Sequence, residues 1–277
     1  MIPLSVIIIC KNEGSNIERT LASICQLTDD IILVDSGSTD NTLLIAKQYK
    51  VRIIQTGWGG FGANKNLGIS HSKYNWILSL DADEVVDPEL FISLKNKTFF
   101  NENIVYRLRF TVFIGNIPLR HGQPGRVKKV RIFNKKKVYW NNHKLHEGLV
   151  HDGSMKIEDL PGHILHYSYR DIDHCIYKTN KYTSLVAEEM SFQKKSSSFV
   201  KIYLNPIYTF ILNYIFRLGI LDGFWGYTYA RMNSYYSFLK YAKLKQLNDN
   251  KILLSQPVTQ EQLSIGSLEQ SNQAILN

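Results

Sequence analysis

The feature that most constrains the fold is a pair of continuous apolar runs near the start of the chain. Leu4–Cys10 reads Leu-Ser-Val-Ile-Ile-Ile-Cys, and Ile31–Val34 reads Ile-Ile-Leu-Val. Runs this rich in β-branched side chains are typical of strands that are buried on both faces of a parallel sheet. Because parallel strands need long, usually helical crossovers, the chain is expected to be an α/β protein.

The following segments continue the alternation of strand and helix. Ser15 and Glu18 have the spacing of a capping box and predict a helix after the first run. Further strands are predicted over Val51–Gln55 and Trp76–Leu80. Short connections between these elements favour a mostly parallel sheet with helices on both faces. Beyond Pro88 the apolar residues alternate instead, which predicts a half-buried antiparallel strand.

Polar side chains cluster where the predicted parallel strands end. The clusters are Asn12 with Glu13, Asp35, Asn64-Lys65-Asn66, and Asp81 with Asp83. Ligands of such sheets bind beyond the carboxyl ends of the strands, so four clusters at one edge predict a binding site.

Asp81 and Asp83 lie one residue apart at the end of a strand, so both are expected on the same side of the pleat. Two carboxylates there repel each other unless a cation lies beside them. Mg²⁺ or Mn²⁺, completed by substrate phosphates, fits such a pair. The alternative is a pair of acids that only caps the next turn.

The balance of charge favours anionic partners. Lysine and arginine number 33 against 24 acids, which gives a net charge of +9. Nucleic acid, phosphorylated substrates and an anionic membrane surface all suit this excess. The three cysteines have neither metal-binding nor redox spacing, and no signal peptide is visible, so a cytoplasmic location is expected.

The C-terminal part is predicted to be helical. Asp171–Met190 has helical periodicity, and residues 199–247 are rich in aromatic and basic side chains. Polar residues interrupt the apolar stretch 202–230, so we expect helices that lie on a membrane surface or pack on the catalytic domain, not a spanning helix. The predicted organisation is a domain over 1–170, a helical region over 171–247 and a polar tail over 248–277.

The glycine-rich segment Gly57–Gly62 matches the dinucleotide-binding fingerprint Gly-x-Gly-x-x-Gly. That fingerprint belongs to the first strand–helix turn of its domain, whereas this segment follows the third predicted strand. A turn that closes near a phosphate or sugar is therefore favoured over a dehydrogenase site.

Taken together, the N-terminal motifs resemble family 2 glycosyltransferases, which are nucleotide-sugar-dependent enzymes of the GT-A fold. The matching pieces are Ser5–Glu13, Val34–Asp40, Asn64–Ile69 and Leu80–Asp83. Ser36 departs from the family pattern, which usually has a second aspartate there. The segments Leu145-His146-Glu147 and Leu165–Arg170 are similar to a bacterial subgroup that adds sugars to the lipopolysaccharide inner core and includes β-1,4-glucosyltransferases.

The resemblance implies a role for each matched residue. Asn12 and Glu13 would flank the nucleotide, Asp35 would hold the uracil or ribose, Lys65 would lie near the diphosphate, Asp81 would contact ribose or sugar, and Asp83 would bind the metal.

An inverting transfer also needs a base that takes the proton of the acceptor hydroxyl. Glu147 is the candidate, with Asp152 and Glu158 as competitors. His146 is expected to contact the diphosphate or the metal, and Arg131 a diphosphate or an acidic acceptor.

The resulting expectation is a hexosyltransferase that uses UDP-glucose and a lipid-linked saccharide such as the lipopolysaccharide inner core. It would act as a peripheral protein at the anionic, cytoplasmic face of the inner membrane. Two other classes stay open: a sugar nucleotidyltransferase and a non-enzymatic nucleic-acid-binding protein. The strand-end acids argue against nucleic acid as the partner.

Overall fold

The computed structural model describes residues 1–141, 148–151 and 153–255. The chain divides into two compact units, and each is described by itself. The first unit comprises Met1–Ile176 and Phe210–Met232, and the second comprises Tyr177–Thr209 and the residues from Asn233 onward.

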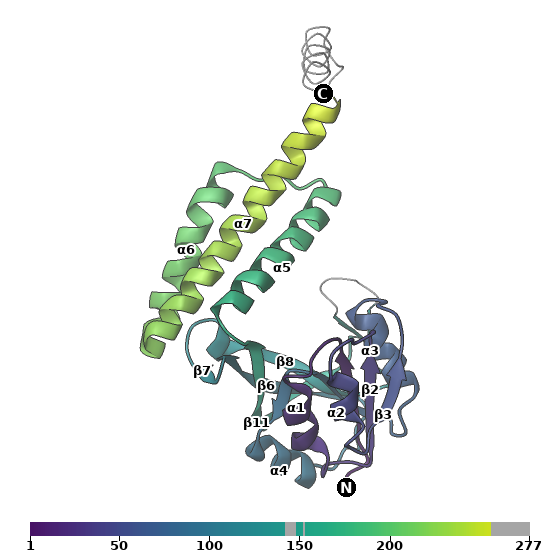
Figure 1. Ribbon diagram of the computed structural model, residues 1–277. Coiled ribbons are helices and arrows are strands. Elements are labelled where there is room, and N and C mark those ends of the chain that lie inside the picture. Colours follow the sequence, from purple (N-terminus) through teal and green to yellow (C-terminus); the bar gives the residue numbers. More distant parts are fainter. Residues whose placement is uncertain (142–147, 152, 256–277) are drawn as a thin grey trace. The chain divides into compact units, whose positions relative to one another are not determined.

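A sheet that is parallel in its N-terminal half forms the centre of the first unit (Figure 1). Its four parallel strands are β1 (Ser5–Cys10), β2 (Asp30–Asp35), β3 (Arg52–Gln55) and β4 (Trp76–Asp81). The crossovers contain α1 (Ile17–Ile24), α2 (Thr42–Ala46) and α3 (Phe61–Ser70). The predicted strand–helix alternation is confirmed.

The sheet becomes mixed beyond β4. Its order is β3-β2-β1-β4-β8-β6-β11-β5, with β7 paired to β6. The added elements are β5 (Glu84–Val86), α4 (Pro88–Asn96), β6 (Ile104–Ile114), β7 (Ile117–Leu119), η1 (Pro124–Arg126), β8 (Lys128–Asn134) and β11 (Lys156–Tyr169), and a separate pair is formed by β9 (Tyr139–Trp140) and β10 (Leu149–Val150). β6 is antiparallel to β8, as predicted, and parallel to β11.

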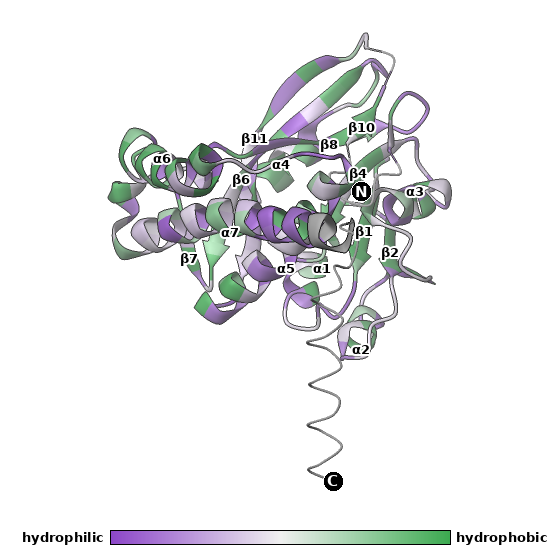
Figure 2. Cartoon of the chain, turned by 90° about the horizontal axis from the view of Figure 1, so that it is seen from above, coloured by the Kyte–Doolittle hydropathy of each residue, from purple (hydrophilic) through white to green (hydrophobic). Residues whose placement is uncertain are grey.

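Helices cover both faces of the sheet because the side chains of the buried strands alternate. Val6 and Ile8 of β1 pack with residues of α1, α2 and α4, whereas Ile7 and Ile9 pack with Ile69 of α3 and with β9. Hydrophobic residues line β1 and β2 in Figure 2. The predicted fold class, α/β with helices on both faces and a helical C-terminal extension, is confirmed.

The predicted capping box is wrong. α1 begins after Asn16, and in the described part of the chain no side chain makes a capping hydrogen bond there. The Asn16 amide donates instead to Glu13 Oε2 at 2.9 Å, so this part of the turn is held by a local side-chain contact.

The C-terminal helices are α5 (Ile172–Phe192), η2 (Val200–Leu204), α6 (Asn205–Ile211), η3 (Leu212–Phe216), η4 (Gly219–Asp222) and α7 (Gly223–Ser255). In the second unit, the Lys243 ammonium of α7 donates to Asn180 Oδ1 and Thr183 Oγ1 of α5, at 2.8 and 2.9 Å. Over the described residues no single helix has the length and apolarity to span a bilayer, although the bent pair 200–216 and 219–250 passes that test jointly. The predicted domain boundaries stay predictions, and residues beyond 255 lie outside the described part.

Candidate active site

The turn that carries Asp81 and Asp83 follows β4 and is fixed by three hydrogen bonds to its backbone. The Asp81 N–H donates to Glu84 Oε2 at 3.0 Å, and the Thr20 hydroxyl of α1 donates to the Ala82 carbonyl at 2.8 Å. The Tyr167 N–H of β11 donates to the Asp83 carbonyl at 2.9 Å. The two carboxylates are therefore presented from a rigid turn.

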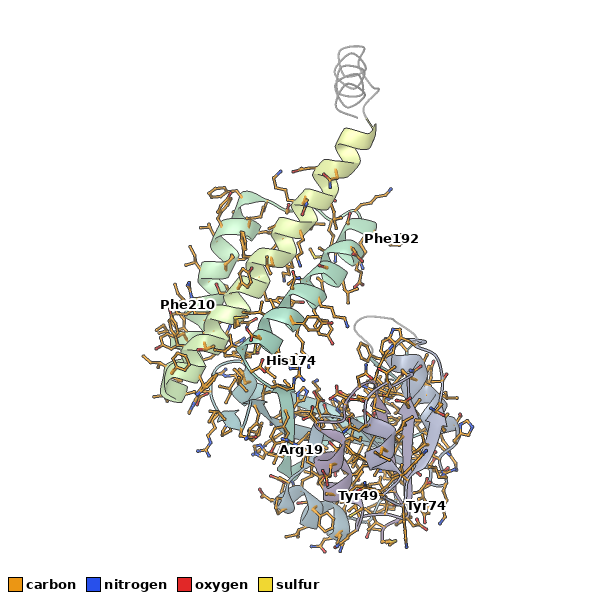
Figure 3. All side chains as sticks on the ribbon, in the orientation of Figure 1. Arg19, Tyr49, Tyr74, His174, Phe192 and Phe210 are labelled. Carbon is orange, nitrogen blue, oxygen red and sulfur yellow. The ribbon has the colours of Figure 1, made fainter. Side chains whose placement is uncertain are left out.

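Aromatic and cationic side chains support Tyr167 in turn. The Arg19 guanidinium, labelled in Figure 3, lies 4.2 Å from the centre of the Tyr167 ring, and Phe113 stacks on that ring at 4.6 Å. Cation–π and stacking contacts of this kind each contribute about 0.5–1.5 kcal/mol. The strand that holds the Asp83 carbonyl is thus tied to α1 and β6.

Four charges of alternating sign form a chain beneath the turn. Lys65 of α3 lies 3.1 Å from Asp81 Oδ1, and Arg131 of β8 lies 2.9 Å from Asp81 Oδ2 and also contacts Glu84. The Lys65 and Glu84 side chains are 1% and 0% exposed, whereas Asp81 is 30% exposed. Of these four charged side chains, only Asp81 therefore has an edge that a ligand can reach.

Burial and charge act in opposite directions on the two acids of this chain. Burial opposes ionisation of Asp81, but the charges of Lys65 and Arg131 outweigh it and hold the pKa of this carboxyl well below its usual range. For Glu84 burial is the stronger effect and raises the pKa, although Arg131 opposes it. Asp81 is thus a permanent anion that two cations already neutralise.

Asp83 has a different environment. Its Oδ2 lies 3.4 Å from Nε2 of His166 on β11. Burial lowers the pKa of His166, but the hydrogen bond with Asp83 and the nearby carboxylates outweigh it and raise the pKa overall. Because Asp81 is engaged by Lys65 and Arg131, Asp83 is the better candidate for a metal ligand.

Carboxylate oxygen and imidazole nitrogen are ligands that suit Mn²⁺, and the carboxylate also suits Mg²⁺. Among the residues that the structure describes, no group of three His, Cys, Asp or Glu side chains is arranged to hold an ion. Asp83 and His166 could supply two ligands, and an ion bound there would take its other ligands from water and a substrate diphosphate, as Mg²⁺ commonly does.

Trp140 of β9 connects α3 to this site. The Lys65 ammonium lies 4.5 Å from the centre of the Trp140 ring. Asn66 donates to the Trp140 carbonyl at 2.7 Å and accepts from the Trp140 N–H at 3.1 Å. A Cβ at Gly62 would lie 1.9 Å from the Asn141 carbonyl oxygen, so only glycine permits this approach of α3 to β9.

The loops after β1 and β2 bind each other. Asp35 is fully buried and accepts from the Gly37 and Ser38 N–H groups at 3.1 and 3.0 Å. Asn12 has a positive φ of 55° and accepts from the Thr39 N–H at 2.8 Å. The Asp35 carboxylate therefore shapes its own turn, and its predicted contact with uracil or ribose stays a prediction.

Ser36, which departs from the family pattern, accepts a hydrogen bond from the Asn64 amide of α3 at 2.7 Å. Asn64 also accepts from the Gly59 N–H at 3.3 Å. The serine thus links the loop after β2 to the glycine-rich segment before α3. Glu13 lies in the neighbouring loop, where its N–H donates to Thr42 Oγ1 at 2.8 Å.

The structure thus brings two predicted residues, Lys65 and Arg131, into direct contact with a third, Asp81, and Asp83 lies two positions after Asp81. The predicted base Glu147, its neighbour His146 and the competitor Asp152 lie outside the described residues.

Glu158, the other competitor, lies on β11 eight residues before His166, which corresponds to about 26 Å along a strand. Its partners there are Lys97 and Lys156, at 3.5 and 3.0 Å. This position is too far from Asp83 for a base at the same site.

Glu84 and His166 were not predicted as site residues. Glu84 directly follows the acidic pair, and the register that places His166 beside it belongs to the pairing of β5 with β11. Glu84 contacts Arg131, and His166 contacts Asp83. Both partners lie far away in the sequence, so the residues next to Glu84 and His166 do not indicate these contacts.

Comparison with known proteins identifies the family of this chain. A sequence model of glycosyl transferase family 2 matches residues 5–158. An uncharacterized glycosyltransferase of Rickettsia bellii (strain RML369-C) is 29% identical over 94% of this chain and 90% of its own. One of Rickettsia typhi (strain ATCC VR-144 / Wilmington) is 30% identical, with 88% and 87% covered.

A lipopolysaccharide core biosynthesis glycosyltransferase, LpsC of Rhizobium meliloti (strain 1021), is 29% identical over 88% of this chain and 93% of its own. The solved structure of S. aureus TarS 1-349 covers 90% of this chain and 92% of its own at 14% identity and a TM-score of 0.43.

The protein is a glycosyltransferase with a GT-A fold. More specifically, the chain belongs to glycosyl transferase family 2, as its N-terminal motifs predict. This assignment favours a sugar transferase over the nucleotidyltransferase and nucleic-acid-binding alternatives.

Proposed function

We propose that the protein is an inverting hexosyltransferase that moves a sugar, with UDP-glucose as the favoured donor, to a lipid-linked saccharide such as the lipopolysaccharide inner core. The observation that supports this proposal is the difference between the two acids: two cations neutralise Asp81, whereas Asp83 lies 3.4 Å from His166. The name of the LpsC relative supports the choice of acceptor.

Departure of the nucleoside diphosphate develops negative charge, and a site accelerates the reaction when positive groups already stand where that charge appears. Lys65, held at this edge of the sheet by Asp81 and the Trp140 ring, acts on the diphosphate through its charge and not by direct contact, because its side chain is 1% exposed. Asp83, with His166, would hold Mg²⁺ or Mn²⁺, which supplies charge neutralisation for the two phosphates. The exposed edge of Asp81 is placed to accept a hydrogen bond from a ribose or sugar hydroxyl.

In the proposed single displacement, Glu147 removes the proton of the acceptor hydroxyl as that oxygen attacks the anomeric carbon. The bond from that carbon to the diphosphate oxygen breaks in the same step. Arg131 does not touch the substrate in this scheme, because it is buried against Asp81 and Glu84. It positions Asp81.

The proposed place of action is the cytoplasmic face of the inner membrane, with the protein bound peripherally. A lipid-linked acceptor is confined to a membrane, and the net charge of +9 suits an anionic surface.

The test is a transfer assay with purified protein, a panel of nucleotide sugars and lipopolysaccharide truncated in its inner core. UDP release that needs the acceptor and a divalent ion is expected with UDP-glucose. Glu147→Gln should bind the donor normally and lose transfer. Equal transfer by this variant would move the base to another residue, and acceptor-dependent release from a different nucleotide sugar would replace the proposed donor.

A further inference from the structure

We propose that residues 215–224, here called the apolar tip, dock the first unit onto the surface of an anionic phospholipid bilayer. This goes beyond the proposed function by assigning membrane contact to one short segment of the unit that also carries Asp81 and Asp83. It depends on that function for its purpose only, because docking is measurable without sugar transfer.

The apolar tip exposes an unusual amount of apolar surface. It includes η3 from Ile215, the turn at Leu218, η4 and the first residues of α7. Phe216 is 71% exposed, Leu221 is 63% exposed and Phe224 is 65% exposed, and Ile215, Leu218 and Ile220 are about half exposed. Contiguous exposed apolar side chains of this number mark an interaction site in a water-soluble unit.

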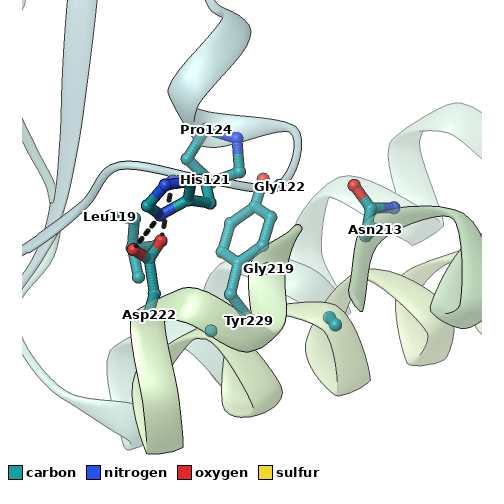
Figure 4. Close-up of a pocket in the computed structure, with 10 residues that line it drawn as sticks. Leu119, His121, Gly122, Pro124, Asn213, Gly219, Asp222 and Tyr229 are labelled. Carbon is teal, nitrogen blue, oxygen red and sulfur yellow. Dashed lines mark hydrogen bonds and ion pairs between the residues drawn. The ribbon is translucent and has the colours of Figure 1, made fainter. Parts of the chain in front are cut away.

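A set of hydrogen bonds fixes the apolar tip to the loop between β7 and β8 (Figure 4). The Asp222 carboxylate accepts from the Arg120 and His121 N–H groups at 2.9 and 2.8 Å and lies 2.7 Å from the His121 ring nitrogen. The Gly122 N–H donates to the Arg217 carbonyl at 2.8 Å. The segment is therefore rigidly attached. Its polar groups bond to the β7–β8 loop, and its apolar side chains are exposed to solvent.

The small hollow behind the hydrogen bonds between Asp222 and the β7–β8 loop is filled by packing and is not a ligand site. Tyr229 and Gly219 line it, and burial raises the pKa of Tyr229 to about 12. Behind the apolar tip, Trp225, Tyr229 and Met232 pack against Ile114, Leu119 and Cys175. The inward face is thus already covered, which leaves the outward face for a partner.

The charge around the apolar tip selects an anionic bilayer as that partner. Within residues 210–232, the C-terminal segment of the first unit, the sequence has two arginines, Arg217 and Arg231, and a single acid, Asp222, whose side chain is 8% exposed and paired with His121. Arg120 and Arg126 are exposed on the loop between β7 and β8. Each basic residue near an anionic membrane surface strengthens binding about fivefold, and apolar side chains that enter the interface add to this.

The test is flotation of the full chain with vesicles of phosphatidylglycerol and phosphatidylethanolamine, without nucleotide sugar. The wild type is expected to bind these vesicles and to bind phosphatidylcholine vesicles far more weakly. The triple variant Phe216→Ser, Leu221→Ser, Phe224→Ser should bind about a hundredfold more weakly. Circular dichroism and UDP binding establish that the variant is folded.

The matched control is Leu44→Ser, Ile92→Ser, Phe100→Ser, which removes apolar side chains that are 68%, 60% and 79% exposed elsewhere in the same unit. It should bind vesicles like the wild type. Equal binding by the apolar-tip variant and the wild type would overturn the proposal. So would a wild type that ignores vesicles but self-associates in solution through the apolar tip, as sedimentation would show. Vesicle binding without acceptor-dependent transfer would instead overturn the proposed function and leave the docking intact.

Discussion

Replacement of Arg131 by methionine tests whether the buried charge chain positions Asp81. Methionine keeps the apolar contact with Phe110, whose ring centre lies 5.5 Å from the guanidinium carbon, but it removes the charge. Glu84 would then be fully buried with only the Asp81 N–H as a described partner for its carboxylate. Asp81 would keep Lys65 at 3.1 Å and its exposed edge.

The expected cost in the free energy of unfolding follows from these contacts. Breaking a buried ion pair on one side costs about 3–5 kcal/mol, because the remaining charge is left without compensation. Most of that cost belongs to Glu84, since Asp81 retains a cation. We therefore expect Arg131→Met to lose about 3–4 kcal/mol at pH 8.

The loss should depend on pH. The pKa of Glu84 is raised above its ordinary 4.5 in the folded protein by burial. A carboxyl with a raised folded pKa contributes stability below its unfolded pKa and loses that contribution as the pH rises through the folded value. Without Arg131 this folded pKa rises further, so the deficit of the variant should shrink between pH 8 and pH 5.

Urea unfolding at several pH values measures both effects. Glu84→Gln is the matched control, and the double variant should recover part of the loss because it leaves no buried charge unpaired. A loss below about 1 kcal/mol that does not change with pH would refute the role given to Arg131.

Three further changes probe the surroundings of the site. Gly62→Ala should lose about 1–3 kcal/mol in urea unfolding, because its Cβ would lie 1.9 Å from the Asn141 carbonyl oxygen; an unchanged midpoint would contradict this close approach. Trp140→Phe should cost under about 1.5 kcal/mol, because the indole N–H has no hydrogen-bond partner among the described residues, whereas Trp140→Ala should cost about 3–5 kcal/mol; equal losses would be inconsistent with this. Lys65→Met should weaken UDP binding in calorimetry by about tenfold because a positive charge near the diphosphate is lost, and unaltered affinity would show that the charge of Lys65 does not act on the diphosphate.

Much of the parallel half of the sheet was predictable because each strand is indicated by a few consecutive residues. The runs that form β1 and β2 are continuous and apolar, and both strands are buried along their whole length. The position of Asp81 at the end of β4 followed from the same pattern. Local sequence was sufficient to predict these strands because a strand that is buried on both faces requires a continuous run of apolar residues.

The environment of the acids was less predictable because it depends on contacts between distant residues. Arg131 meets Glu84 from 47 positions away, and His166 reaches Asp83 through the pairing of β11 with β5. The capping box failed for a related reason, since Asn16 bonds to Glu13 instead of capping the helix. Which partner a side chain bonds to depends on competing groups that the sequence pattern does not reveal.

The most direct test of the central claim is the dependence of UDP binding on Mn²⁺, measured by titration calorimetry. Asp83, which lies 3.4 Å from His166, is the proposed metal ligand, so Mn²⁺ should strengthen UDP binding by at least about tenfold in the wild type. Asp83→Asn should bind UDP equally with and without Mn²⁺ and keep the melting temperature of the wild type. Equal strengthening by Mn²⁺ in this variant, or none in the wild type, would contradict the assignment of the metal to Asp83.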